Sequence, residues 1–171
     1  MHPNPTHPNP SHDRKGVSVL SRALISLRCL APAAVPAPTR IDDPLRFVTG
    51  VFRHFVAAQS TKRSYEPPED FYTPQLEKLI RADKKQANGE AGCLDFVFWT
   101  GGQDWTIKQL KITSEPGTPD RQTVIASFLN LDGPTEIHFD FRRLNGRWLL
   151  DDARSVREPR WILSKILKCA P

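Results

Sequence analysis

The residues best placed to do chemistry lie in one short stretch, residues 94–105. It sets Asp95, Gln103 and Asp104 around a pair of glycines, beside four aromatic residues. Two carboxylates separated by a flexible turn can act as an acid–base pair or bind a hard metal ion. An aspartate just before a strand can equally accept hydrogen bonds from backbone amides, which is its commoner use. Gln103 has the same two interpretations, as a partner for a buried backbone group or as a ligand contact.

A second candidate pair lies further along the chain, at His138 and Asp140. Polar and apolar residues alternate over 135–143, so His138, Asp140 and Arg142 fall on one face of a strand. Inside a cavity, the histidine could act as a base that the aspartate orients. If the sheet is antiparallel with one solvent-exposed face, these residues form a solvated row on that face instead. The arginine on the same face favours that second interpretation.

Two aromatic residues complete the candidate ligand contacts, Tyr72 at a helix start and Trp105 at the base of residues 94–105. Ordinary packing explains each of them equally well. The chain has no Gly-x-Ser-x-Gly sequence, no Cys-x-x-Cys spacing and no glycine-rich phosphate loop that leads into a helix. We therefore predict no catalytic residue, no metal ion and no cofactor.

Length and charge restrict the classes of function. A chain of 171 residues suits one ordinary domain. Its formal charge is +5, but residues 1–34 carry four of the 24 basic residues and only one of the 19 acidic residues. No basic run is interleaved with aromatic residues, as a surface that stacks nucleic-acid bases requires. We expect no nucleic-acid partner.

The first 42 residues are typical of a tail, a signal peptide and a linker. His-Pro-Asn-Pro occurs twice in the first ten residues, which predicts disorder. A basic pair, an apolar stretch over 17–37 and small residues around Ala33 follow in the order of a secretory signal. Arg22 and Arg28 interrupt the apolar part, so an organelle transit peptide is the alternative. The stretch is too short to span a membrane stably. We expect a periplasmic or secreted protein whose domain covers residues 43–168.

The cysteines agree with export. Removal of a signal peptide leaves Cys93 and Cys169, an even pair that an oxidising compartment could join. Such a disulfide would add about 4 kcal/mol of stability in the chain-entropy model. Two separate thiols are the alternative.

The predicted elements fit an α+β fold. Asp43 and Pro44 begin a helix with an apolar stripe, listed as Leu45, Val48, Val51, Phe52, Phe55 and Val56. A second helix runs from Thr73-Pro74 to Asn88-Gly89. Strands follow over 105–113, with a bulge between 107 and 110, then over 122–131 and 135–143. Asn145-Gly146 predicts a hairpin turn into a strand at Trp148, and residues 161–167 a short C-terminal helix. We expect six aromatic residues in the core: Phe52, Phe55, Trp105, Phe128, Phe139 and Trp148.

The chain resembles an uncharacterised bacterial family, domain of unknown function 3828, in four short motifs: Tyr72-Thr73-Pro74 with Leu76, Leu94-Asp95-Phe96, Gln103-Asp104-Trp105 and Trp148-x-x-Asp151-Asp152. That family is similar to the nuclear transport factor 2-like (cystatin-like) superfamily. The resemblance covers about residues 43–167 and implies helices packed as a cone on a strongly bent antiparallel sheet, in an exported protein. It supplies no established catalytic residues. Val97 and Phe98 stand where the family pattern has an aspartate and a proline.

Together these features predict an exported, non-catalytic protein that binds a small ligand or an envelope protein. The alternative is a small cavity enzyme, like an isomerase or hydratase, that uses aspartate and histidine as acid and base. It requires at least two of Asp95, Asp104, His138 and Asp140 to converge in one cavity. A homodimer that forms through the open face of the sheet is a further structural possibility.

Overall fold

The computed structural model describes residues 39–61 and 63–168. The described residues all belong to one compact unit, which begins at Pro36. The expected tail, the signal peptide, most of the linker and Cys169 lie outside the described residues.

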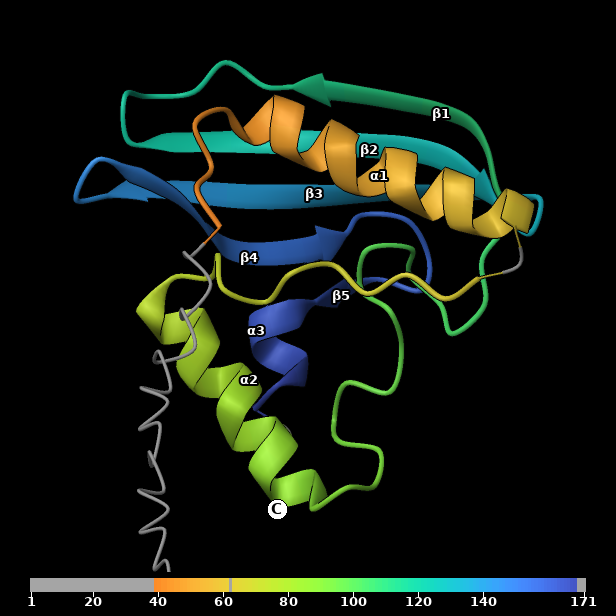
Figure 1. Cartoon of the computed structure of the whole chain (residues 1–171), viewed down its shortest axis with the longest axis horizontal. Helices are drawn as coiled ribbons and strands as arrows, with labels where there is room; N and C mark the ends of the chain where they lie inside the picture. The colour runs from red at the N-terminus through yellow and green to blue at the C-terminus, as the bar shows by residue number, and fades with distance from the viewer. Residues whose placement is uncertain (1–38, 62, 169–171) are drawn as a thin grey trace, which may run out of the picture. The chain divides into compact units, whose positions relative to one another are not determined.

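One antiparallel sheet organises the described domain (Figure 1). Its five strands follow one another in chain order as a meander: β1 Ile107–Ser114, β2 Arg121–Asn130, β3 Gly133–Leu144, β4 Arg147–Ser155 and β5 Trp161–Ile162. Helices accompany this sheet, so the predicted α+β class is confirmed.

Two local predictions about the sheet are confirmed. The register of β1 against β2 shifts between Lys108 and Lys111, where Gln109 has a φ of 52°. This is the bulge that the switch of apolar face indicates. Asn145 and Gly146 have φ values of 51° and 77°. Positive φ at both central residues is the requirement of a two-residue hairpin, and it joins β3 to β4.

Helix α1, Pro44–Thr61, crosses one face of the sheet (Figure 1). The Asp43 carboxylate accepts a hydrogen bond from the Arg46 amide at 3.1 Å, which satisfies a free donor of the first turn. The buried stripe contains Val48, Val51, Phe52 and Phe55, as predicted. Val56 does not belong to it and is 38% exposed. The stripe continues at Ala58, and Val56 lies about 100° beyond Phe55, away from the sheet.

Helix α2, Pro74–Ala87, begins and ends where the sequence predicts. The Thr73 side chain accepts a hydrogen bond from the Leu76 amide, and Asn88 ends the helix in the left-handed conformation. Unlike α1, α2 does not cross the sheet but contacts β4 (Figure 1). The short helix α3, Leu163–Ile166, contacts β4 and β5.

The C-terminal segment differs from the prediction. Trp161 and Ile162 form β5, paired with Ser155 and Arg154, and only then does α3 begin. Asp152 explains where the helix starts, because its carboxylate accepts the Ser164 amide at 3.0 Å and the Ser164 hydroxyl at 2.5 Å. Residue spacing within 161–167 carries no information about this distant partner.

Aromatic rings fill the space between α1 and the sheet. Phe52 of α1 meets Phe128 and Phe139 of the sheet, with ring centroids 5.4 and 6.1 Å apart. The predicted core residues Trp105 and Trp148 are only half-buried and pack at its margin. Trp99, Phe71 and Phe141, which the prediction omitted, are fully buried.

Candidate functional site

The main role of residues 94–105 is to supply a side chain to the hydrophobic core. Trp99 is 2% exposed and stacks on Phe139, with ring centroids 4.7 Å apart and an interplanar angle of 27°. A tight turn presents this ring: the Val97 amide donates to the Gly102 carbonyl at 3.1 Å, and the Gly101 amide donates to the Val97 carbonyl at 2.9 Å. Gly101 has a φ of 74°, which glycine adopts without strain. The density of aromatic residues in this stretch is thus explained by packing.

The polar residues of the same stretch do not form a paired-carboxylate site. Gln103 donates from Nε2 to the backbone carbonyl of Asp95 at 3.1 Å, so it stabilises the turn. The Asp95 and Asp104 side chains are exposed, and within the described part of the chain neither carboxylate has a hydrogen bond or an ion pair. Among the described residues, no group of three or more His, Cys, Asp or Glu could hold a metal ion.

Asp95, Gln103 and Tyr72 come together at a groove of about 700 Å³ that we call the α2 groove. One wall is α2, and the other is the segment from Gly89 to Phe98. Its apolar lining includes five side chains, Ile80, Leu94, Phe96, Phe98 and Leu167. Trp105, His138 and Asp140 do not line it.

The charge of the α2 groove is acidic. Four carboxylates line it, those of Glu69, Asp83, Glu90 and Asp95, against the single ammonium of Lys84. Lys84 forms an exposed ion pair with Glu69, and three carboxylates of the lining remain beyond that pair. The groove therefore combines an apolar floor with an excess of negative charge.

Asp83 is the buried member of these four, at 7% exposure. Its Oδ1 accepts the Cys93 amide at 2.7 Å, which fixes the 89–98 wall against α2. A Cβ on Gly92 would lie 2.5 Å from Asp83 Oδ2, so the close approach requires glycine. The sequence offers no signal for this contact, because the paired residues are not adjacent.

Tyr72 is buried where the chain approaches α2. Burial raises the pKa of its phenol, and the nearby charge of Glu69 raises it further. The phenol therefore stays neutral at the groove, where it can donate or accept a hydrogen bond.

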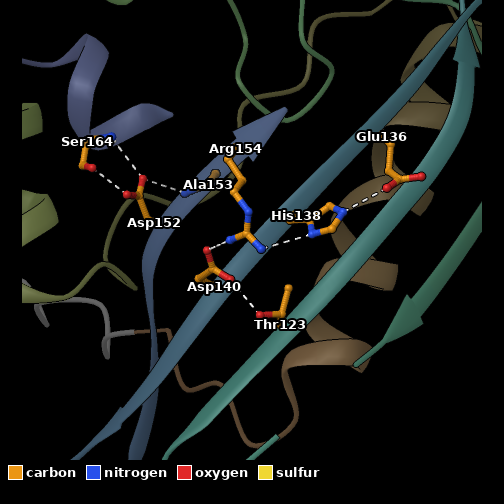
Figure 2. A network of polar contacts seen from close by, with 8 residues as sticks. All are labelled: Thr123, Glu136, His138, Asp140, Asp152, Ala153, Arg154 and Ser164. Carbon is orange, nitrogen blue, oxygen red and sulfur yellow. Dashed lines mark hydrogen bonds and ion pairs between the residues drawn. The ribbon is translucent and has the colours of Figure 1, made fainter. Parts of the chain in front are cut away.

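His138 and Asp140 lie on the face of the sheet turned away from α1, in a network with residues of three strands (Figure 2). Arg154 of β4 donates to the Asp140 carboxylate and also approaches His138 Nδ1 at 3.2 Å. Thr123 of β2 donates to Asp140 at 2.7 Å. His138 Nε2 lies 3.0 Å from Glu136 Oε1. We call these five residues the His138 network.

The predicted row does lie on the outer face of the sheet, where the side chains of Asp140 and Arg142 are 31% and 38% exposed, but the expectation of an exposed His138 is wrong. His138 is only 9% exposed, because Arg154 of the neighbouring strand β4 and Glu136 of its own strand contact its ring. Arginine has no acceptor, so Nδ1 must accept from Arg154 and Nε2 carries the proton that reaches Glu136. The hydrogen bond from His138 lowers the pKa of Glu136 against the raising effect of its partial burial, and the nearby guanidinium of Arg157 lowers it further. With its hydrogen bonds to other strands, this arrangement reinforces the sheet.

Cys93 is disulfide-bonded, and its partner lies outside the described residues. The pairing of Cys93 with Cys169 therefore stays a prediction.

The helices of the described region include none with the length and apolar character needed to cross a bilayer. No family model, curated protein or solved structure matches this chain.

Proposed function

We propose that this protein is a non-catalytic binding protein whose α2 groove holds a cationic ligand with an apolar body. The observation that carries the proposal is the lining of the groove, in which apolar side chains form the floor and carboxylates outnumber ammonium groups. A volume of about 700 Å³ also suits a small organic molecule or a few side chains of a protein partner.

Complementary charge favours a cation over an anion or a neutral ligand. Lys84 is already paired with Glu69, and Asp83 holds the Cys93 amide. Glu90 and Asp95 remain as exposed carboxylates of the lining, with no ion pair in the described part of the chain. Such carboxylates attract a cation and repel an anion, which gives selectivity more than affinity.

The geometry favours binding over the alternative of a small cavity enzyme. That enzyme requires two acid–base groups in one cavity, whereas Asp95 lies at the α2 groove and His138 and Asp140 lie on the outer face of β3. His138 and Asp140 are engaged with Arg154, which orients them within the sheet. Neither of them lines the α2 groove.

We also propose export to the periplasm or beyond, and membership of domain of unknown function 3828 with its cone-shaped, cystatin-like packing. A disulfide at Cys93 supports an oxidising compartment. The order of two helices followed by an antiparallel meander supports the family's fold. A homodimer through the outer sheet face stays a separate prediction.

The test uses dodecyltrimethylammonium, a single-chain cation, below its critical micelle concentration. Isothermal titration calorimetry of the full oxidised protein should show saturable binding, and the double charge reversal Glu90→Lys with Asp95→Lys should weaken it by about tenfold. The control is Glu115→Lys with Glu66→Lys, which makes the same change of charge at exposed sites outside the groove lining. Equal loss in both double variants would contradict a specific role of the groove, as would an absence of binding to the wild-type protein.

A further inference from the structure

A second groove, of about 660 Å³, lies between the β4–β5 end of the sheet and α3. We call it the α3 groove. Its apolar lining comes from Val156, Trp161, Ile162 and Ile166. The remaining lining includes three cationic side chains, Arg154, Arg160 and Lys165, and no carboxylate among the described residues. Its charge is thus opposite to that of the α2 groove.

The two grooves are separate sites. Trp161 lines the α3 groove, and its ring packs against Phe96, which lines the α2 groove, with ring centroids 5.4 Å apart. Asp152 holds α3 in place through the amide and hydroxyl of Ser164 (Figure 2). Because both walls are fixed by specific contacts, the α3 groove is formed before any ligand arrives.

The cationic side chains of the α3 groove still have N–H groups that can bind a ligand. Arg154 is oriented by Asp140 and His138, which use two of its five N–H donors, so donors remain. Among the described residues, Arg160 forms an ion pair only with Glu158, at 3.2 Å, and both side chains are largely exposed, so that ion pair is weak. Lys165 has no ion pair in the described residues.

We propose that the α3 groove binds a free single-chain amphiphile with a carboxylate head, a fatty-acid-like anion. The carboxylate would lie among Arg154, Arg160 and Lys165, where a planar guanidinium can hold both of its oxygens. The alkyl chain would cover Trp161, Ile162 and Ile166. A concave site of this volume matches a single small molecule better than an extended lipid surface. This site goes beyond the proposed function, because its groove and the charge of its ligand are different.

The first measurement locates the probe. Dodecanoate is titrated below its critical micelle concentration into the full oxidised protein, labelled with nitrogen-15. The indole N–H resonance of Trp161, assigned with the Trp161→Phe variant, should shift and saturate. Dodecyltrimethylammonium has the same alkyl chain and the opposite charge, and from the α2 groove it can reach Trp161 only through Phe96. Its effect on that resonance should be lost in the variant Glu90→Lys with Asp95→Lys, whereas the dodecanoate shift should persist there. An unmoved Trp161 resonance with dodecanoate would overturn the proposal.

The second measurement tests the cations. Arg160→Glu with Lys165→Glu should weaken dodecanoate binding by about tenfold in calorimetry. The control is Lys111→Glu with Arg121→Glu, which makes the same change of charge at exposed positions of β1 and β2. Equal affinity in the two double variants would contradict the proposal. Binding to phosphatidylglycerol vesicles without binding of free dodecanoate would contradict it too.

Failure of dodecyltrimethylammonium to bind would refute the proposed function alone, because that cation tests the other groove.

Discussion

The ring of Phe96 packs against the ring of Trp161, with centroids 5.4 Å apart, and this contact separates the two grooves of the domain. The two residues lie far apart in the chain. The pairing of β5 with β4 places Trp161, and the segment after α2 places Phe96. One aromatic contact thus supplies a wall to an acidic groove and to a basic groove.

We expect Phe96→Ala to weaken binding in both grooves. The change removes apolar area from the α2 groove and leaves Trp161 without its supporting ring. Loss of about half of a phenylalanine side chain's burial corresponds to about 1 kcal/mol, or roughly fivefold in affinity, for each probe. Calorimetry with dodecyltrimethylammonium and with dodecanoate measures this, and Phe96→Leu is the control that keeps most of the apolar volume. An unchanged affinity for either probe would show that the grooves do not share this wall.

Trp99→Ala should destabilise the domain strongly. Its side chain is fully buried and stacks on Phe139, so truncation leaves a large cavity. We expect a loss of about 3–5 kcal/mol in the free energy of unfolding, measured by urea denaturation. Val56→Ala is the control in α1, where 38% exposure limits the loss to about 0.5 kcal/mol. A similar small loss in both variants would refute a central role for Trp99.

The sequence predicts well what neighbouring residues determine. Thr73-Pro74 and Asn88 delimit α2, and Asn145-Gly146 forms the turn between β3 and β4, because capping and positive φ depend on a few adjacent residues. The bulge in β1 follows from the alternation of apolar residues in the same way.

Contacts between distant residues were not predicted. Trp99 lies in a turn, where no periodicity marks a core position, and its partners come from α1 and β3. Simple alternation placed His138 in water, but Arg154 and Glu136 cover it. Both grooves depend on how α2 and α3 pack beside the sheet, which residue spacing does not encode. For this reason Tyr72, Asp95 and Gln103 were found as groove residues, whereas Asp83, Phe96 and Trp161 were missed.

Gly92→Ala should be destabilising, although it adds only a methyl group. The new Cβ would lie 2.5 Å from Asp83 Oδ2, so the carboxylate must move and its hydrogen bond to the Cys93 amide is lost. We expect a cost of about 1–3 kcal/mol by urea denaturation. Gly50→Ala in α1 is the matched control: its Cβ meets nothing within 4 Å, so we expect a gain of about 0.5–1 kcal/mol. Equal effects of the two substitutions would contradict the tight contact at Gly92.

The His138 network should make stability depend on pH in the acid range. The pKa of Glu136 lies below its ordinary value of 4.5 in the folded state, chiefly because His138 hydrogen-bonds its carboxylate. A lowered pKa contributes stability that is present above that ordinary value and is lost as the pH falls through the folded one. Glu136→Gln should therefore lower the urea midpoint at pH 7, and the difference from wild type should narrow in acid. Glu66→Gln, at an exposed position, is the control. A constant difference at all pH values would exclude the linkage.

The two tyrosines should make the free energy of unfolding depend on pH in the alkaline range. Burial raises the pKa of Tyr65 and Tyr72 above the ordinary 10.0, and Glu69 adds to the shift at Tyr72. A raised pKa contributes stability that is present below 10.0 and is lost as the pH rises through the folded value. In the Tyr65→Phe variant, Tyr72 is the single tyrosine. Its phenolate absorbance should rise only above the pH at which a tyrosine model compound ionises. The far-ultraviolet circular dichroism of the fold should be lost over the same pH range. Tyr72→Phe should leave an earlier transition, because the shift at Tyr65 is smaller. If Tyr72 ionised at pH 10.0 in a fully folded protein, its burial at the α2 groove would be refuted.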